Sequence, residues 1–104
     1  MTKEEFNDMT DALKFGHDLE FSYKNERFFL ENFVEYHGLY KMTSTNDGIL
    51  IQKIEGSNIK EQIDNFLSLV IFDKPISQIY SEIEILDIEW TDLNILIFSV
   101  LIFV

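Results

Sequence analysis

The spacing of apolar residues changes along the chain, and this change constrains the fold more than any other feature of the sequence. Phe6, Met9 and Leu13 recur at helical spacing, whereas apolar and polar side chains alternate from residue 17 onward. The first pattern indicates an amphipathic helix, and the second indicates a strand with one solvent-exposed face. Helical spacing returns after residue 58. This order predicts an α+β fold in which helices pack on an antiparallel sheet.

The N-terminal helix is expected over residues 2–15. Thr2 and Glu5 have the spacing of a capping box, and Gly16 follows as a stop signal. The next residues alternate as a strand does, so that one face would carry His17, Leu19, Phe21 and Tyr23.

Turn signals divide the following residues into a predicted four-stranded antiparallel meander, because sequential strands joined by short turns pair with their neighbours. Asn25 tolerates the left-handed backbone of a tight turn, and "TNDG" ending at Gly48 is the strongest turn signal in the chain. "HG" at His37 and Gly38 is interpreted as a third turn. The strands are expected at residues 17–23, 27–36, 39–44 and 49–54.

A second helix is expected after "EGSN", where Asn58 and Glu61 repeat the capping-box spacing. Its apolar side would carry Ile59, Ile63, Phe66, Leu67 and Val70. Pro75 is expected at the first position of a short helical turn. In "EIEILDIEW" the alternation slips by one residue, which predicts a final strand with a bulge at Leu86 and Asp87.

This order of elements resembles that of small uncharacterised proteins of low-GC Gram-positive bacteria, on the stretches "DLEFSYKNERFF" and "FDKPISQIYSEIEI". The landmarks are an F-x-Y that ends at Tyr23 and an F-D-x-x-I that begins at Phe72, and the resemblance covers residues 11–90. The group favours a glycine in the first hairpin turn, where this chain has Lys24, Asn25 and Glu26. The resemblance implies a bacterial α+β protein and assigns no activity or functional residue.

The segment "LNILIFSVLIFV", from Leu93 to Val104, carries no charge, although the whole chain has a formal net charge of -11. A helix of this length is about 18 Å long and cannot span a hydrocarbon core of about 30 Å. Three interpretations stay open: a buried terminal strand or helix, a patch covered by a partner, or the start of a truncated membrane anchor. We expect one α+β domain over residues 1–92, followed by this apolar segment over residues 93–104.

Composition excludes several classes of function. Nineteen acidic residues against eight basic ones disfavour binding to nucleic acid, because that affinity comes largely from Lys and Arg. The absence of cysteine excludes disulfides, thiolate zinc sites and cysteine nucleophiles. The start "MTKEEFNDMT" has neither the basic nor the apolar region of a secretory signal, so a cytoplasmic location is expected.

Residues that could carry chemistry are few. His17 and His37 show no catalytic spacing and are interpreted as a strand residue and a turn residue. "TSTNDG" lacks the acidic ligands of a calcium loop, and no metal or cofactor site is expected. Paired carboxylates can raise one another's pKa and act as acid and base, but a solvated strand face is the first interpretation of Glu82, Glu84, Asp87 and Glu89.

The leading hypothesis is therefore a non-enzymatic protein-interaction domain, of a regulatory or toxin-neutralising type, with a basic protein as partner. Neighbouring strand residues face opposite sides, so Phe28 and Phe29 cannot both enter one core unless a bulge intervenes or the sheet is covered on both sides. One of them therefore points to a binding surface. The candidate partner surface comprises Tyr23, Phe28, Phe29, Tyr36, Tyr40, Glu82, Glu84 and Glu89.

Two other classes of function stay open. The first is a membrane-associated accessory domain anchored through Leu93 to Val104. The second is a small-molecule-binding or hydrolytic enzyme that uses the acidic strand.

Overall fold

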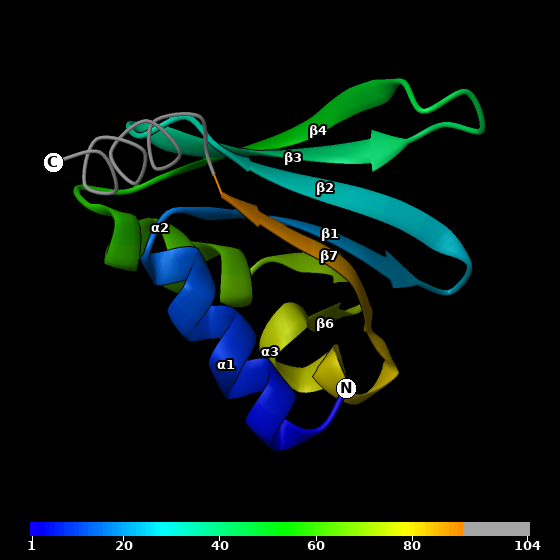
Figure 1. The fold of residues 1–104 in the computed structure, drawn as a ribbon, viewed down its shortest axis with the longest axis horizontal. Helices are drawn as coiled ribbons and strands as arrows, with labels where there is room; N and C mark the ends of the chain where they lie inside the picture. The colour runs from blue at the N-terminus through cyan, green and yellow to red at the C-terminus, as the bar shows by residue number, and fades with distance from the viewer. Residues whose placement is uncertain (91–104) are drawn as a thin grey trace, which may run out of the picture.

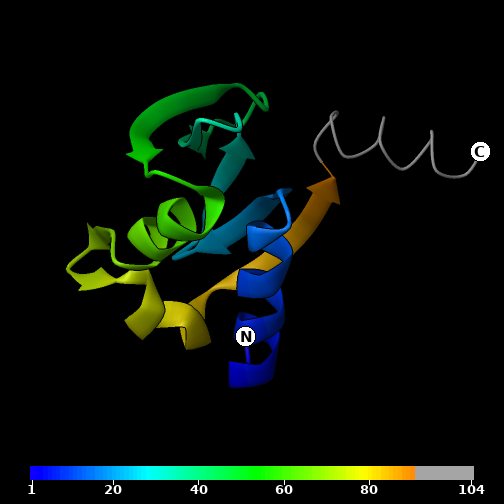
Figure 2. The same cartoon turned by 90° about the vertical axis from the view of Figure 1, so that its left-hand side faces the viewer.

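A five-stranded antiparallel sheet carries the helices on one of its faces (Figures 1 and 2). The computed structural model describes residues 1–90, and the strand order in its main sheet is β4-β3-β2-β1-β7. The elements are α1 (Lys3–Lys14), β1 (His17–Tyr23), β2 (Glu26–Asn32), β3 (Tyr36–Met42), β4 (Gly48–Glu55), α2 (Ile59–Leu67), β5 (Val70–Phe72), β6 (Lys74–Pro75), α3 (Ile76–Ile79), a 3-10 helix (Tyr80–Glu82) and β7 (Glu84–Trp90). The predicted α+β fold, with its antiparallel meander, is confirmed.

Helix α1 begins as predicted. The Thr2 side chain accepts a hydrogen bond from the Glu5 backbone N–H at 3.1 Å, and the Glu5 carboxylate accepts one from the Thr2 backbone N–H at 3.1 Å. This capping box satisfies two N–H groups that the first turn would otherwise leave without partners. The buried side of the helix consists of Phe6, Met9 and Leu13.

The β1–β2 hairpin also follows the sequence pattern. Lys24 and Asn25 have φ angles of 50° and 64°, the left-handed pair that a two-residue turn between antiparallel strands requires. The next strand places its two neighbouring phenylalanines on opposite faces: Phe28 is 1% exposed and packs among the core residues, whereas Phe29 is only partly buried.

The predicted bulge in β7 is present. Glu20 pairs with Asp87 and Phe21 pairs with Ile85, so that Leu86 is the extra residue of the bulged strand. Because the bulge shifts the register by one residue, Ile85 and Ile88 both pack against the core.

The predicted turn at His37 and Gly38 is wrong, because both residues lie inside β3. The chain reverses instead between Asn32 and Tyr36, where Val34 has a φ angle of 72° and its N–H donates to the Asn32 side chain at 2.8 Å. Gly38 serves close packing: an added Cβ would lie 2.9 Å from the Tyr40 ring and 3.0 Å from the Phe33 ring.

The second helical region differs from the prediction in detail. The Asn58 side chain caps α2 by accepting from the Glu61 N–H at 2.8 Å, but the Glu61 carboxylate accepts from Ser57 and not from Asn58. Gln62 is buried on the helix face that was predicted to be apolar, whereas Val70 is 59% exposed in β5.

The chain between α2 and β7 contains a hairpin that the sequence did not predict. Strands β5 and β6 pair around Asp73, whose φ angle is 55°. Pro75 follows as the N-cap of α3, one position before the place predicted for it. Its extended backbone, with φ -61° and ψ 150°, leads directly into the helix.

The core lies between the helices and the sheet. Its buried apolar residues are Phe6, Met9, Leu13, Leu19, Phe21, Tyr23, Phe28, Leu30, Leu39, Ile54, Ile63, Phe66, Ile76, Ile79 and Ile83. No helix within residues 1–90 has both the length and the hydropathy needed to cross a membrane. The predicted apolar segment over residues 93–104 lies outside the described residues.

Candidate interaction surface

The face of the main sheet opposite the helices is called the open face here. All the helices lie on the other side of the sheet in both views of the fold (Figures 1 and 2), and no element within residues 1–90 packs on the open face. Strand alternation places polar and aromatic side chains there instead of a second apolar layer. The open face is therefore one candidate surface for a partner.

One half of the open face, over β2, β3 and β4, is aromatic. Phe29 and Tyr40 are directly opposite each other in the β2·β3 register. They line a hollow of about 260 Å³ together with Glu31, Met42 and Gly48. Partial burial raises the pKa of the Tyr40 phenol, and the nearby Glu31 carboxylate raises it further. Tyr40 therefore presents a neutral hydroxyl at the edge of an aromatic surface.

The other half of the open face, over β1 and β7, is acidic. Glu20 stands directly opposite Asp87, and Ser22 stands opposite Glu84. Like charges in direct cross-strand register destabilise a sheet by up to about 1 kcal/mol, so this arrangement is unfavourable for the isolated domain. Arg27 relieves part of the repulsion, with its Nη1 3.5 Å from a Glu20 carboxylate oxygen.

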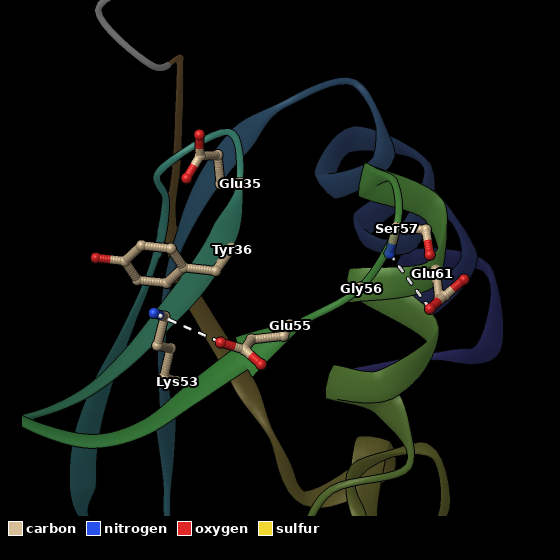
Figure 3. Close-up of a pocket in the computed structure, with 7 residues that line it drawn as sticks. All are labelled: Glu35, Tyr36, Lys53, Glu55, Gly56, Ser57 and Glu61. Carbon is tan, nitrogen blue, oxygen red and sulfur yellow. Dashed lines mark hydrogen bonds and ion pairs between the residues drawn. The ribbon is translucent and has the colours of Figure 1, made fainter.

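A second hollow, of about 550 Å³, lies where β4 leads into α2 (Figure 3). The Lys53 ammonium lies 3.5 Å from the Glu55 carboxylate and 4.4 Å from the centre of the Tyr36 ring. The lining residues are Glu35, Tyr36, Lys53, Glu55, Gly56, Ser57 and Glu61. Three carboxylates against one ammonium leave this hollow negative, which favours a cationic group as its occupant.

The structure brings together only part of the predicted partner surface. Phe29 and Tyr40 share the open face, and Tyr36 lies near them, with its ring stacked 4.9 Å from that of Phe33. The predicted roles of Tyr23 and Phe28 need correction, because these side chains are 4% and 1% exposed and belong to the core. Strand alternation carries them inward with Phe21 and Leu30.

The predicted acidic residues are divided between two elements. Glu84 lies in β7 opposite Ser22, and the backbone of Glu89 pairs with Asp18. Glu82 ends the 3-10 helix, and together with Glu84 it lines a third hollow near Met1 and Glu5. Glu31, Glu35 and Glu55 were not predicted as part of the surface, although the alternation of Glu31 with Phe29 along β2 was a signal that could have found the first of them.

His37 has no role on this surface, because it is fully buried. Its Nδ1 lies 2.6 Å from the Gln62 side-chain oxygen, and the Gln62 amide donates to the Val34 carbonyl at 3.2 Å. Since that Gln62 oxygen can only accept, the His37 proton belongs on Nδ1. Burial lowers the pKa of His37, and the hydrogen bond to Gln62 opposes this shift. The predicted turn histidine is thus a neutral residue that joins β3 to α2.

Among the described residues, no group of His, Cys, Asp and Glu side chains is arranged to hold a metal ion.

Comparison with known proteins gives no further guidance about this surface. No family model matches the chain, and neither a curated protein nor a solved structure matches it.

Proposed function

We propose that this protein is a non-enzymatic interaction domain that binds a basic partner protein through the open face. One observation carries the proposal: aromatic and acidic side chains adjoin on a sheet face that no element within residues 1–90 covers. More specifically, we propose that binding regulates or neutralises the partner, as an antitoxin does with its toxin.

The two halves of the open face would contribute differently to binding. Aromatic side chains are enriched at protein interfaces because they bury a large area with few rotatable bonds, which suits Phe29 and Tyr40 as central contacts. A field of carboxylates speeds the encounter with a basic surface. Lys or Arg side chains of a partner would also remove the repulsion between Glu20 and Asp87.

The first test is a comparison of charge variants in a pull-down from native lysate. The variant Glu84→Gln with Asp87→Asn removes two carboxylates from β7, and we expect it to recover much less of any partner than the wild type does. The control, Glu4→Gln with Asp8→Asn, removes the same charge from exposed positions on α1 and should recover as much as the wild type.

Salt gives an independent readout of the same interaction. The Debye length falls from about 10 Å at 0.1 M salt to about 3 Å at 1 M, so binding by exposed carboxylates should weaken as salt rises. Recovery of no protein above background, or equal losses in the two double variants, would contradict the proposal.

A membrane-associated accessory role is the second proposal, and it is favoured by one observation, the uncharged sequence from Leu93 to Val104. An anchored protein should float with phospholipid vesicles and require detergent to stay dispersed. If the full chain stays monomeric in aqueous buffer without detergent and does not float with vesicles, this role is excluded.

A further inference from the structure

Strand β4 forms one edge of the main sheet, and within residues 1–90 no strand pairs with its outer side. An edge strand presents a row of backbone N–H and C=O groups that can pair with another chain. Natural proteins protect such edges with charged side chains, proline, bulges or a covering element. How well each part of β4 is protected therefore indicates whether it can accept a partner.

The C-terminal half of β4 is protected. Lys53 and Glu55 supply charge there, and their backbone carbonyls accept hydrogen bonds from the Gln52 side chain at 3.1 Å and the Asn65 side chain at 2.8 Å. Helix α2 also packs against this part of the strand, where Ile54 is buried.

The N-terminal half of β4 has little of this protection. Ile49, Leu50 and Ile51 are consecutive aliphatic residues with exposed fractions of 58%, 51% and 42%. Because neighbouring strand residues face opposite sides, apolar surface is exposed on both faces of the strand. In Figure 1 this end of the β3–β4 hairpin projects beyond the helices. A bulge between Leu50 and Gln52 is the one protective device within this half in the described structure.

The opposite edge of the sheet shows how this protein protects a strand. Strand β7 carries Glu84 and Asp87, and both side chains are exposed. Charged residues along an edge prevent pairing with another strand, because pairing would bring the charges out of water. Leu86 of β7 is also 43% exposed, but it stands between these two acidic residues, whereas Ile49, Leu50 and Ile51 follow one another without a charge. The N-terminal half of β4 is therefore the less protected edge.

We propose that the outer edge of β4 binds an extended segment of the partner protein by strand addition, and that this segment carries basic residues followed by alternating aliphatic ones. This inference rests on the proposed interaction role and names the edge that would recognise the partner. In an antiparallel arrangement the aliphatic residues of the segment would pair beside Ile49 and Ile51, and the basic residues before them would stay unpaired and lie near the acidic hollow at Glu35, Glu55 and Glu61. Main-chain hydrogen bonds would give affinity, and these two neighbourhoods would give specificity.

Charge argues against a second copy of the same chain as the occupant. Two copies with a formal net charge of -11 each would repel as they approach. A basic segment is instead attracted by that field. The lysine of β4 does not change this preference, because Lys53 is already paired with Glu55.

The test is a nuclear magnetic resonance titration of the full chain with a capped synthetic peptide as long as β4. The peptide begins with lysine and arginine and continues with alternating threonine and valine. We expect saturable shifts of the Gly48 to Ile51 backbone amides and slower hydrogen exchange there. The variant Ile49→Lys should weaken binding by about tenfold, because a lysine on the edge opposes pairing.

Two controls separate strand addition from simple charge attraction. Val70→Lys adds the same charge at a position with a matching exposed fraction, 59% against 58%, and should bind like the wild type. A second peptide, with serines in place of lysine and arginine, should bind more weakly and with little dependence on salt.

Several results would overturn the inference. Equal binding of the two peptides would exclude a basic segment as the preferred partner, and equal weakening in Ile49→Lys and Val70→Lys would exclude the β4 edge. A dimer that Ile49→Lys dissociates, without peptide binding, would identify a second copy as the occupant. Shifts confined to the open face over β1 and β7 would overturn strand addition and still support the proposed interaction role.

Discussion

Replacing Phe28 with alanine is expected to lower the free energy of unfolding by about 3–5 kcal/mol, whereas the same change at Phe29 should lower it by about 1 kcal/mol or less. Phe28 is 1% exposed and its ring stacks 5.3 Å from that of Phe21, so truncation leaves a cavity in the core. Phe29 is partly buried on the open face and would lose mainly its cross-strand contact with Tyr40.

Urea unfolding followed by circular dichroism measures both changes. The two variants lose the same atoms from adjacent positions of one strand, so each is a control for the strand propensity of the other. If the slope of the unfolding free energy against urea concentration is the same in the wild type and both variants, the substitutions have not changed the compactness of the denatured state. If Phe29→Ala destabilises as much as Phe28→Ala, the open face is covered in solution and is not available to a partner.

Much of the fold could be predicted because its signals are local. The Thr2 capping box, the Asn25 turn and the slip at Leu86 each depend on a few neighbouring residues, and the structure contains all of them. The opposition of Phe28 and Phe29 could also be predicted, since it follows from strand geometry alone. The same alternation pairs Phe28 with Leu30 and Phe29 with Glu31, which was an unused signal that Phe28 faces the core.

The errors arise where side-chain packing overrides local backbone preference. "HG" suggests a turn, but Gly38 is needed because the rings of Phe33 and Tyr40 lie against it, and His37 is held by Gln62. Gln62 is 25 residues from His37, and the two rings come together over Gly38 only once the strand has formed, so neither contact could be recognised from the sequence. The true turn has Val34 in a left-handed conformation that this residue type rarely adopts. Its local signal was Asn32, whose side chain accepts from the Val34 N–H, and that signal was not used.

The candidate surface could be predicted only in part for the same reason. The acidic and aromatic residues could be identified from the sequence, but their division between core and open face depends on register. Tyr23 and Phe28 were assigned to the surface by residue type, and they are buried. The exposure of β4 was not predicted either, because an edge strand is recognised only when the strand order is known.

The buried pair of His37 and Gln62 supports the second large prediction. Gln62→Leu should lower the free energy of unfolding by about 1–3 kcal/mol, because the His37 Nδ1–H would lose its acceptor in the core. His37→Leu should lower it by a similar amount, since the Gln62 oxygen would then be left without a donor. When both residues become leucine, no polar group of the pair stays buried alone. The double variant should therefore be more stable than the sum of the single losses predicts, by about 0.5–3 kcal/mol.

The pH dependence of unfolding provides a readout that a purely steric role would not change. Burial lowers the pKa of His37 in the folded protein, so the unfolded chain takes up a proton at higher pH than the folded one does. The contribution of neutral His37 to the free energy of unfolding is complete above its ordinary pKa of about 6.5 and is lost as pH falls from there toward its folded-state pKa.

Between about pH 7.5 and 5.5, the wild type should therefore lose stability relative to the double leucine variant. All other ionisable groups are common to both proteins, so this difference reports on His37. If the two stability curves stay parallel over this range, His37 is not held neutral by the core.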